Sequence, residues 1–173
     1  MNKVKKVLMT MFGLVMLPLL FACSNNQSAG IEAIKSKGKL VVALNPDFAP
    51  FEYQKVVDGK NKIVGSDIEL AKAIATELGV ELELSPMSFD NVLASVQSGK
   101  ADLAISGVSK TDERSKVFDF STSYYTSKNK LIVKKSDLAT YQSVNDLAQK
   151  KVGAQKGSIQ ETMAKDLLQN SSL

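Results

Sequence analysis

The 173-residue chain contains no histidine, no tryptophan and one cysteine. The absence of histidine excludes a Ser-His-Asp or Cys-His catalytic group, a histidine-ligated metal and a histidine pH switch. One cysteine excludes an intramolecular disulfide framework and a cysteine-rich zinc site. The few prolines and glycines, 4 and 10, exclude collagen-like and low-complexity sequence. The whole chain is 44% hydrophobic and 23% charged, and this is enough apolar material for a packed core.

The net charge of +4 comes mainly from the start of the chain. Three of the 22 cations, Lys3, Lys5 and Lys6, stand in the first 22 residues, where there is no acid, which leaves 19 cations against 18 acids. A near-neutral remainder is not typical of a nucleic-acid-binding surface. We therefore expect no nucleic-acid partner.

Residues 1–22 are organised as a secretory signal peptide. The positive segment Met1–Lys6 is followed by the uncharged stretch Val7–Ala22, which falls short of the roughly 20 apolar residues that span a bilayer. An abrupt polar run then begins after Cys23. We expect cleavage directly before Cys23.

The letters before Cys23, LFA, resemble a bacterial lipobox, although Phe21 departs from the small or branched residue that is usual there. We expect Cys23 to carry acyl chains, palmitate among them, and residues 23–30 to form a flexible tether. The protein would then stay on the outer face of the cell membrane. A buried or leftover thiol at Cys23 is the alternative.

Alternating strand and helix patterns predict an α/β domain on a mostly parallel sheet. The expected elements of this domain are helix Ile31–Lys37, strand Lys39–Leu44, hairpin Val56–Val64, helix Ser66–Leu78, strand Val80–Leu84, helix Phe89–Ser98 and strand Asp102–Ser106. A second α/β unit begins near residue 129. Its expected elements are strand Lys130–Val133, helix Ser143–Leu147, strand Val152–Ala154 and helix Ile159–Leu168. With 45 residues it is too short for a core of its own, so we expect the chain to stop inside its second domain.

Arg114 is the one arginine among 21 lysines. Two interpretations are open: planar, bidentate recognition of a carboxylate, which lysine cannot provide, or a surface salt bridge with Asp112 or Glu113. Its context favours the first. The preceding strand ends at Gly107, and parallel sheets bind ligands beyond the carboxyl ends of their strands.

Two neighbours complete this predicted carboxylate receptor. Ser109 adds a hydroxyl and an amide N–H, and Thr111 can cap the short helix that presents Arg114. The alternative for Gly107 is an ordinary turn glycine.

Four stretches together resemble the solute-binding proteins of polar-amino-acid ABC transporters. They are LVVALNPDFAPFEY, VGSDIELAKAIATELG, AISGVSKTDERSKVFDFSTSYY and SVNDLAQKKVGAQKGSIQE, in the order of that family, and the likeness covers residue 35 to the end. Ser66 departs from the aromatic or aliphatic residue of the family pattern. The resemblance implies a two-lobe, class II periplasmic-binding-protein-like α/β fold. Its first lobe would be residues 31–123, its hinge crossing 124–128, and residues 129–173 the start of an incomplete second lobe.

The resemblance also implies a ligand site. Arg114 would grip the α-carboxylate beside Gly107 and Ser109, with the helix start at Ser158 adding its dipole. The other implied contacts are Phe48 and Phe89 around the aliphatic part, Asn45 at the side chain, and Gln155 from the second lobe. Of the two loop aromatics, we expect Phe51 to pack and Phe48 to face the cleft. The acid that usually binds the α-ammonium is absent from this sequence.

The implied function is binding without catalysis, cofactor or metal. A lipid-anchored, extracytoplasmic monomer would capture a free L-amino acid with a polar side chain and deliver it to an ABC permease and its ATPase. The amide of Asn45 can donate and accept, which favours an uncharged ligand over a cationic one, although Asp47 or Glu52 could still pair with a cation.

Other function classes stay open. They are an enzyme on the same fold, such as a dehydratase or the binding lobe of a cell-wall lytic enzyme, and a ligand-sensing receptor domain. A truncated chain that binds nothing is a further possibility.

Overall fold

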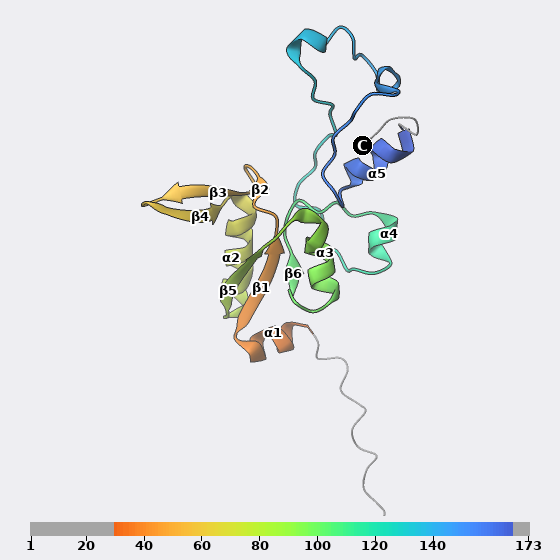
Figure 1. Cartoon of the computed structure of the whole chain (residues 1–173). Helices are drawn as coiled ribbons and strands as arrows, with labels where there is room; N and C mark the ends of the chain where they lie inside the picture. Colours follow the sequence, from red (N-terminus) through yellow and green to blue (C-terminus); the bar gives the residue numbers. More distant parts are fainter. Residues whose placement is uncertain (1–29, 168–173) are drawn as a thin grey trace, which may run out of the picture.

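The computed structural model describes residues 30–167. The predicted signal peptide, Cys23 and the tether up to residue 29 lie outside the described residues. The described chain has a sheet region, residues 31–123, and a distal segment, residues 129–167, at one end of it (Figure 1). The helices are α1 (Ile31–Lys37), α2 (Ser66–Leu78), α3 (Phe89–Gln97), α4 (Asp112–Ser115) and α5 (Ile159–Leu167).

A parallel sheet forms the centre of the sheet region. Strand β1 (Lys39–Leu44) lies between β5 (Glu81–Pro86) and β6 (Leu103–Ala104). The apolar run KLVVAL thus has a neighbour on both edges, as its lack of alternation predicted. Strand β6 is shorter than the predicted Asp102–Ser106, because its ladder with β1 covers two residues before the backbone turns toward Gly107.

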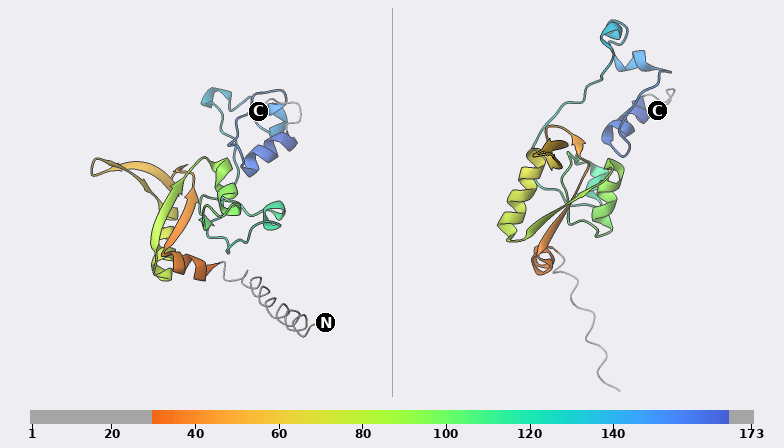
Figure 2. Two further views of the ribbon diagram at one scale, coloured as in Figure 1. Left: turned by 60° about the horizontal axis from the view of Figure 1, so that its bottom comes forward. Right: turned by 60° about the vertical axis from the view of Figure 1, so that its left-hand side comes forward.

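Helices α2 and α3 cover opposite faces of this sheet (Figure 2). Successive residues of a strand point to opposite faces, so β1 supplies side chains to two separate cores. One core joins β1 to α2 through Leu40, Val42, Ala71 and Ala75. The other joins β1 to α3 through Val41, Ala43 and Val92. This arrangement confirms the predicted α/β layering of the sheet region.

An antiparallel sheet extends from the loop after β1. It consists of β2 (Asp47–Phe48), β3 (Glu52–Val57) and β4 (Lys60–Val64), with the turn at Asp58 and Gly59. The hairpin is longer than the predicted Val56–Val64, since pairing continues to Tyr53 opposite Val64.

Gly65 connects this hairpin to α2. Its φ of 134° lies in a region that L side chains rarely adopt, and a Cβ there would stand 2.1 Å from the Phe51 carbonyl oxygen. The tight passage lets the N–H of Asp67, in the first turn of α2, donate to that same carbonyl. Glycine at this position therefore fixes how the hairpin meets the helix.

The distal segment differs from the sequence prediction. Within the part of it that the structure describes, Lys130–Val133 and Val152–Ala154 are not strands, and both predictions were wrong. A strand needs a hydrogen-bonded neighbour to satisfy its backbone groups, and neither run is paired in a sheet within the described chain. The predicted helix Ser143–Leu147 is a 3₁₀ helix over Val144–Leu147, preceded by another at Lys135–Asp137.

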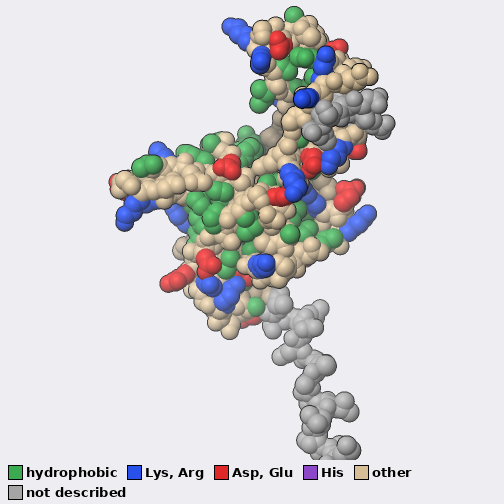
Figure 3. Space-filling view, viewed as in Figure 1, with side chains coloured by type: hydrophobic (Ala, Val, Ile, Leu, Met, Phe, Trp, Pro, Cys, Tyr) green, Lys and Arg blue, Asp and Glu red, His purple; other side chains and the backbone are tan. Residues whose placement is uncertain are grey.

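Apolar side chains stay at the surface of the distal segment (Figure 3). Ile132 is 97% exposed, and Leu131 and Leu138 are also exposed. Helix α5 has formed as predicted, up to the described limit of the chain at residue 167. Within residues 30–167, none of the helices is both long enough and apolar enough to cross a bilayer.

Candidate functional site

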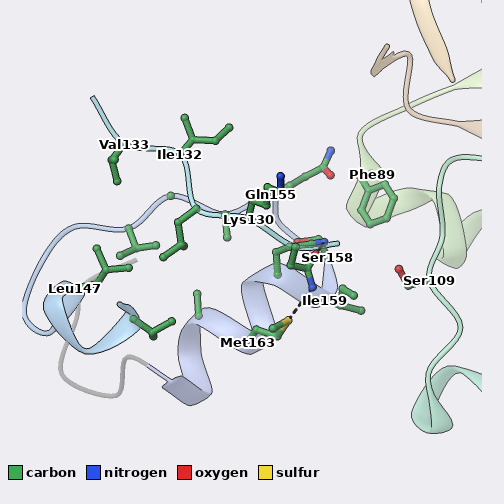
Figure 4. A pocket seen from close by; sticks show the side chains of 18 of the residues that line it. Phe89, Ser109, Lys130, Ile132, Val133, Leu147, Gln155, Ser158, Ile159 and Met163 are labelled. Carbon is green, nitrogen blue, oxygen red and sulfur yellow. Dashed lines mark hydrogen bonds between the residues drawn. The ribbon is translucent and has the colours of Figure 1, made fainter. Parts of the chain in front are cut away.

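A cavity of about 690 Å³ lies between the carboxyl end of the parallel sheet and the distal segment. All eight ligand-binding residues that the resemblance implied line it. They are Asn45, Phe48, Phe89, Gly107, Ser109, Arg114, Gln155 and Ser158. Phe89 and Ser109 stand on one side of the cavity and face Gln155 and Ser158 on the other (Figure 4). Strand ends thus gather residues that are far apart in the sequence.

Arg114 is held rigidly at the rim of this cavity. The Thr111 hydroxyl caps α4 by accepting from the Arg114 backbone N–H at 3.2 Å, as the sequence predicted. The guanidinium donates from Nη1 to the Ser109 carbonyl at 2.7 Å and from Nη2 to the Gly157 carbonyl at 3.0 Å. Partial burial lowers the pKa of Arg114 below its ordinary value. Such a group stays cationic at neutral pH and can receive a carboxylate.

The alternative for Arg114, a salt bridge with Asp112 or Glu113, is not formed in the described part of the chain. Its charge therefore lacks an acidic partner there. A planar cation that is partly buried and bonded to carbonyls is suited to an anionic ligand.

Three aromatic rings, those of Phe48, Phe89 and Tyr141, border the cavity. Phe48 is 49% exposed and stacks on Phe51, with ring centroids 5.1 Å apart. Phe51 is less exposed and also meets Tyr125 edge-on at 4.8 Å. Gly107 lies under the Phe48 ring, where a Cβ would stand 2.7 Å from the ring carbon Cε1. Its φ of 56° also lies in the left-handed region, so glycine suits this position both as a turn residue and for the close approach of the ring.

Asn45 directly follows β1. It lies at the floor of the cavity and is buried. Its amide nitrogen donates to the Asp47 carboxylate at 3.0 Å and to the Met87 carbonyl at 3.1 Å. Its Oδ1 accepts from Nε2 of Gln155 at 3.0 Å. Asn45 therefore links the sheet region to the distal segment.

Sequence reasoning missed the buried polar groups beneath Asn45. Ser106 lines the cavity, accepts from the Asn45 backbone N–H at 2.9 Å and donates to Oε1 of Glu52 at 2.8 Å. Glu52 is fully buried, and burial raises its pKa to about 8. Asp67 faces Glu52 and accepts from the Tyr124 hydroxyl at 2.9 Å. Two features of the sequence could have pointed to these groups. Glu52 is an acid in a loop rich in aromatic residues, and Ser106 directly precedes Gly107.

The distal segment closes the other side of the cavity. Ser158 is buried and caps α5, its hydroxyl accepting from the Glu161 N–H at 3.1 Å. A salt bridge of 2.8 Å between Lys156 and Asp90 ties the start of α5 to the start of α3. Gly157 fits closely here, because a Cβ would stand 2.9 Å from Cα of Asp90.

The lining of the cavity has a mixed chemical character. In the described residues there is no cluster of three or more cysteines or acids that could hold a metal ion. The cavity is lined by Arg114 and four lysines, by the acids Glu52 and Asp137, by several hydrogen-bonding groups and by three aromatic rings. These groups recognise charge and shape.

Comparison with known proteins identifies relatives over most of the chain. Residues 40–169 match the family model of bacterial extracellular solute-binding proteins, family 3. The arginine-binding extracellular protein ArtP of Bacillus subtilis (strain 168) is 45% identical over 148 residues, which cover 86% of this chain and 54% of ArtP. The chain thus spans about half the length of this curated relative.

Solved structures give the same family relationship. The amino acid ABC transporter substrate-binding protein AbpA from Streptococcus pneumoniae Canada MDR_19A, bound to L-arginine, is 98% identical with a TM-score of 0.80. The match covers 82% of this chain and 60% of that one. The arginine-bound form of domain 1 from TmArgBP is 48% identical with a TM-score of 0.50, over 54% of this chain and 71% of that one. The matches confirm the predicted two-lobe, periplasmic-binding-protein-like α/β fold with its second lobe incomplete.

Proposed function

The chain belongs to the bacterial extracellular solute-binding proteins of family 3, and on this basis we propose that it captures free arginine outside the cytoplasm. The arginine-bound structure of a protein 98% identical to it supports this proposal, as does the name of its Bacillus relative. The sequence favoured an uncharged polar ligand over a cationic one. These relatives favour the cationic one.

The observation that carries the proposal is the position of Arg114. Its guanidinium stands at the rim of the cavity, is fixed by two carbonyls and lacks an acidic partner among residues 30–167. It would bind the ligand α-carboxylate together with the backbone near Gly107 and Ser109. Phe48 and Phe89 would enclose the aliphatic part of the ligand side chain.

Residues 31–123 act as the first lobe in this proposal, 124–128 as a hinge crossing and 129–173 as the start of the second lobe. Capture would occur by closure of the lobes, with Gln155 and Ser158 contributed from the second. The contacts of Gln155 with Asn45 and of Gly157 with Arg114 support such a closed arrangement. Release to an ABC permease and its ATPase would follow.

The anchor at Cys23 is part of the same proposal, because a receptor must stay near its permease. The residues concerned lie outside the described part of the chain, so the signal pattern alone supports it. Replacing Cys23 with Ala is expected to release the protein into the medium or leave it unprocessed. Unchanged mass and membrane attachment of the variant would contradict the anchor.

Calorimetry of the full-length protein with the twenty amino acids tests the function. We expect arginine to bind most tightly. Arg114→Lys should cost about 2–5 kcal/mol of binding free energy, because a lysine ammonium cannot replace a bidentate charged pair. Lys110→Met is a matched control, since Lys110 is exposed and does not line the cavity. Arginine affinity of Arg114→Lys within threefold of the unmodified protein would overturn the proposed role of Arg114.

A further inference from the structure

We propose that Asp47 and Glu52 are positioning residues that make the cavity floor a hydrogen-bond acceptor throughout, so that it selects ligands whose side chains end in N–H donors. The floor is defined here as the Asn45 amide and the Ser106 hydroxyl. The inference rests on the proposed function, because it assumes that an amino acid occupies the cavity. It adds the physical reason for preferring a guanidinium.

The Asn45 amide can point in one direction only. Both of its N–H donors are used, one by the Asp47 carboxylate and one by the Met87 carbonyl. Turning the amide over would place its oxygen against two groups that cannot donate. The oxygen Oδ1 is therefore left for the cavity, where the N–H of Gln155 already occupies it at 3.0 Å. In the folded chain, the Asn45 amide can therefore only accept a hydrogen bond from a ligand, although the free side chain can donate and accept.

The Ser106 hydroxyl is fixed in the same sense. A hydroxyl has one hydrogen and two lone pairs. One lone pair accepts from the Asn45 backbone N–H, and the hydrogen goes to Oε1 of Glu52. A single lone pair remains, so Ser106 too can only accept from a ligand in the cavity that it lines.

The surroundings of Glu52 explain why Oε1 accepts and does not donate. Its other oxygen, Oε2, is buried and meets no N–H or O–H donor within the described chain. The group that it faces is the acid Asp67, whose own Oδ2 takes the Tyr124 hydroxyl. One proton between the two acids satisfies Oε2 and leaves Oε1 free to accept from Ser106. The raised pKa of Glu52, about 8, agrees with a protonated Glu52 at neutral pH.

The floor therefore presents two neutral oxygens and no hydrogen. A guanidinium or ammonium group satisfies them, whereas a carbonyl or carboxylate oxygen would meet another oxygen. Sites built to bond an N–H reject analogues that lack it strongly, because the buried acceptors are left unpaired. This preference for N–H donors does not depend on a charged group in the floor, because both oxygens belong to neutral groups.

The test compares arginine with citrulline, which replaces one guanidinium NH₂ by a carbonyl oxygen. Calorimetry of the full-length protein should give at least about a 100-fold preference for arginine. In Glu52→Leu the Ser106 hydrogen loses its acceptor and can turn into the cavity, so the preference should fall below about tenfold. Glu52→Gln keeps an oxygen for Ser106 and an N–H for Asp67, and should keep the preference. Glu69→Gln, an exposed acid of α2, is the surface control.

The outcomes separate the inference from the function. Arginine binding with an unchanged preference in Glu52→Leu, or an equal loss in Glu52→Gln, would overturn the inference alone. If the unmodified protein binds no arginine, the proposed function fails first. Should Glu52→Leu not fold, Ser106→Ala gives the answer, because it removes the acceptor lone pair while Glu52 stays beside Asp67. Its arginine affinity should fall at least about tenfold while that for citrulline changes less, and equal changes for both ligands would refute the proposal.

Discussion

Two segments of the chain begin with nearly the same four residues and have opposite surroundings. Strand β1 begins KLVVAL at Lys39, and residues 130–135 read KLIVKK. In β1, Leu40 and Val42 are fully buried, whereas Ile132 in the distal segment is 97% exposed. The apolar run alone therefore does not decide whether a strand forms.

The neighbours of each segment explain the difference. β1 has a strand on each edge and a helix on each face, which satisfy its backbone and remove its side chains from water. Residues 130–133 are not paired with a strand within the described chain, and Leu131 and Ile132 stay exposed. A run of this kind becomes a strand only when the rest of a sheet is present.

The sharpest test replaces matched apolar residues in the two segments. Leu40→Ala should lower the free energy of unfolding by about 2–5 kcal/mol, because a cavity remains in a close-packed core. Ile132→Ala should change it by less than about 0.5 kcal/mol, since its side chain is already in water. Urea unfolding followed by circular dichroism measures both. Equal losses would show that residues 130–133 are buried in solution.

A smaller difference is expected for two glycines. Gly65→Ala should cost at least about 1–3 kcal/mol, because its φ is unfavourable and the new Cβ would collide with the Phe51 carbonyl. Gly153→Ala in the distal segment has open space around it and should change stability by less than about 0.5 kcal/mol. The same unfolding experiment applies. A Gly65→Ala variant as stable as the parent would contradict the tight passage between hairpin and α2.

A pH dependence of stability is also expected, and it has opposite signs in the two regions. Burial raises the pKa of Glu52 to about 8 from its ordinary 4.5, so the folded state binds an extra proton between these values. The free energy of unfolding should therefore fall as pH rises from about 5 to 8, by no more than about 1.4 kcal/mol per pH unit. Hydrogen bonds from Ser143 lower the pKa of Asp146 in the distal segment, and its contribution is lost instead as the medium becomes acidic.

Unfolding curves at several pH values measure this dependence, with Glu52→Gln as the matched variant. The variant should remove the fall between pH 5 and 8. If the variant keeps the full slope, another group carries the proton.

The sequence predicted much of the sheet region, and the reason is local. The helix periodicity of Ser66–Leu78, the Thr111 cap and the position of Arg114 after a strand end all depend on neighbours within a few residues. The failures were non-local. Lys130–Val133 was predicted as a strand from its composition, but the partner that a strand needs cannot be read from four letters.

The properties of the site residues also differ in whether local sequence or distant residues determine them. That Asn45 stands at a strand end was visible in the sequence, whereas the direction of its amide was not. Asp47 and Met87 decide that direction, and Met87 is 42 residues away. Glu52 appeared as an acid in a loop that could turn toward a cation. The fold instead buries it against Ser106, 54 residues along the chain.

The sequence by itself determined the order of strands and helices over residues 31–104 and the place of Arg114 after the end of a strand. Backbone propensity and hydrophobic period depend on adjacent residues, so they can be read in one dimension. Only the tertiary structure decided which apolar runs were paired, which acid kept its proton and which face each hydrogen-bonding group turned to the cavity. These depend on burial and on distant partners, because a donor or an acid acquires its state from whatever the fold places around it.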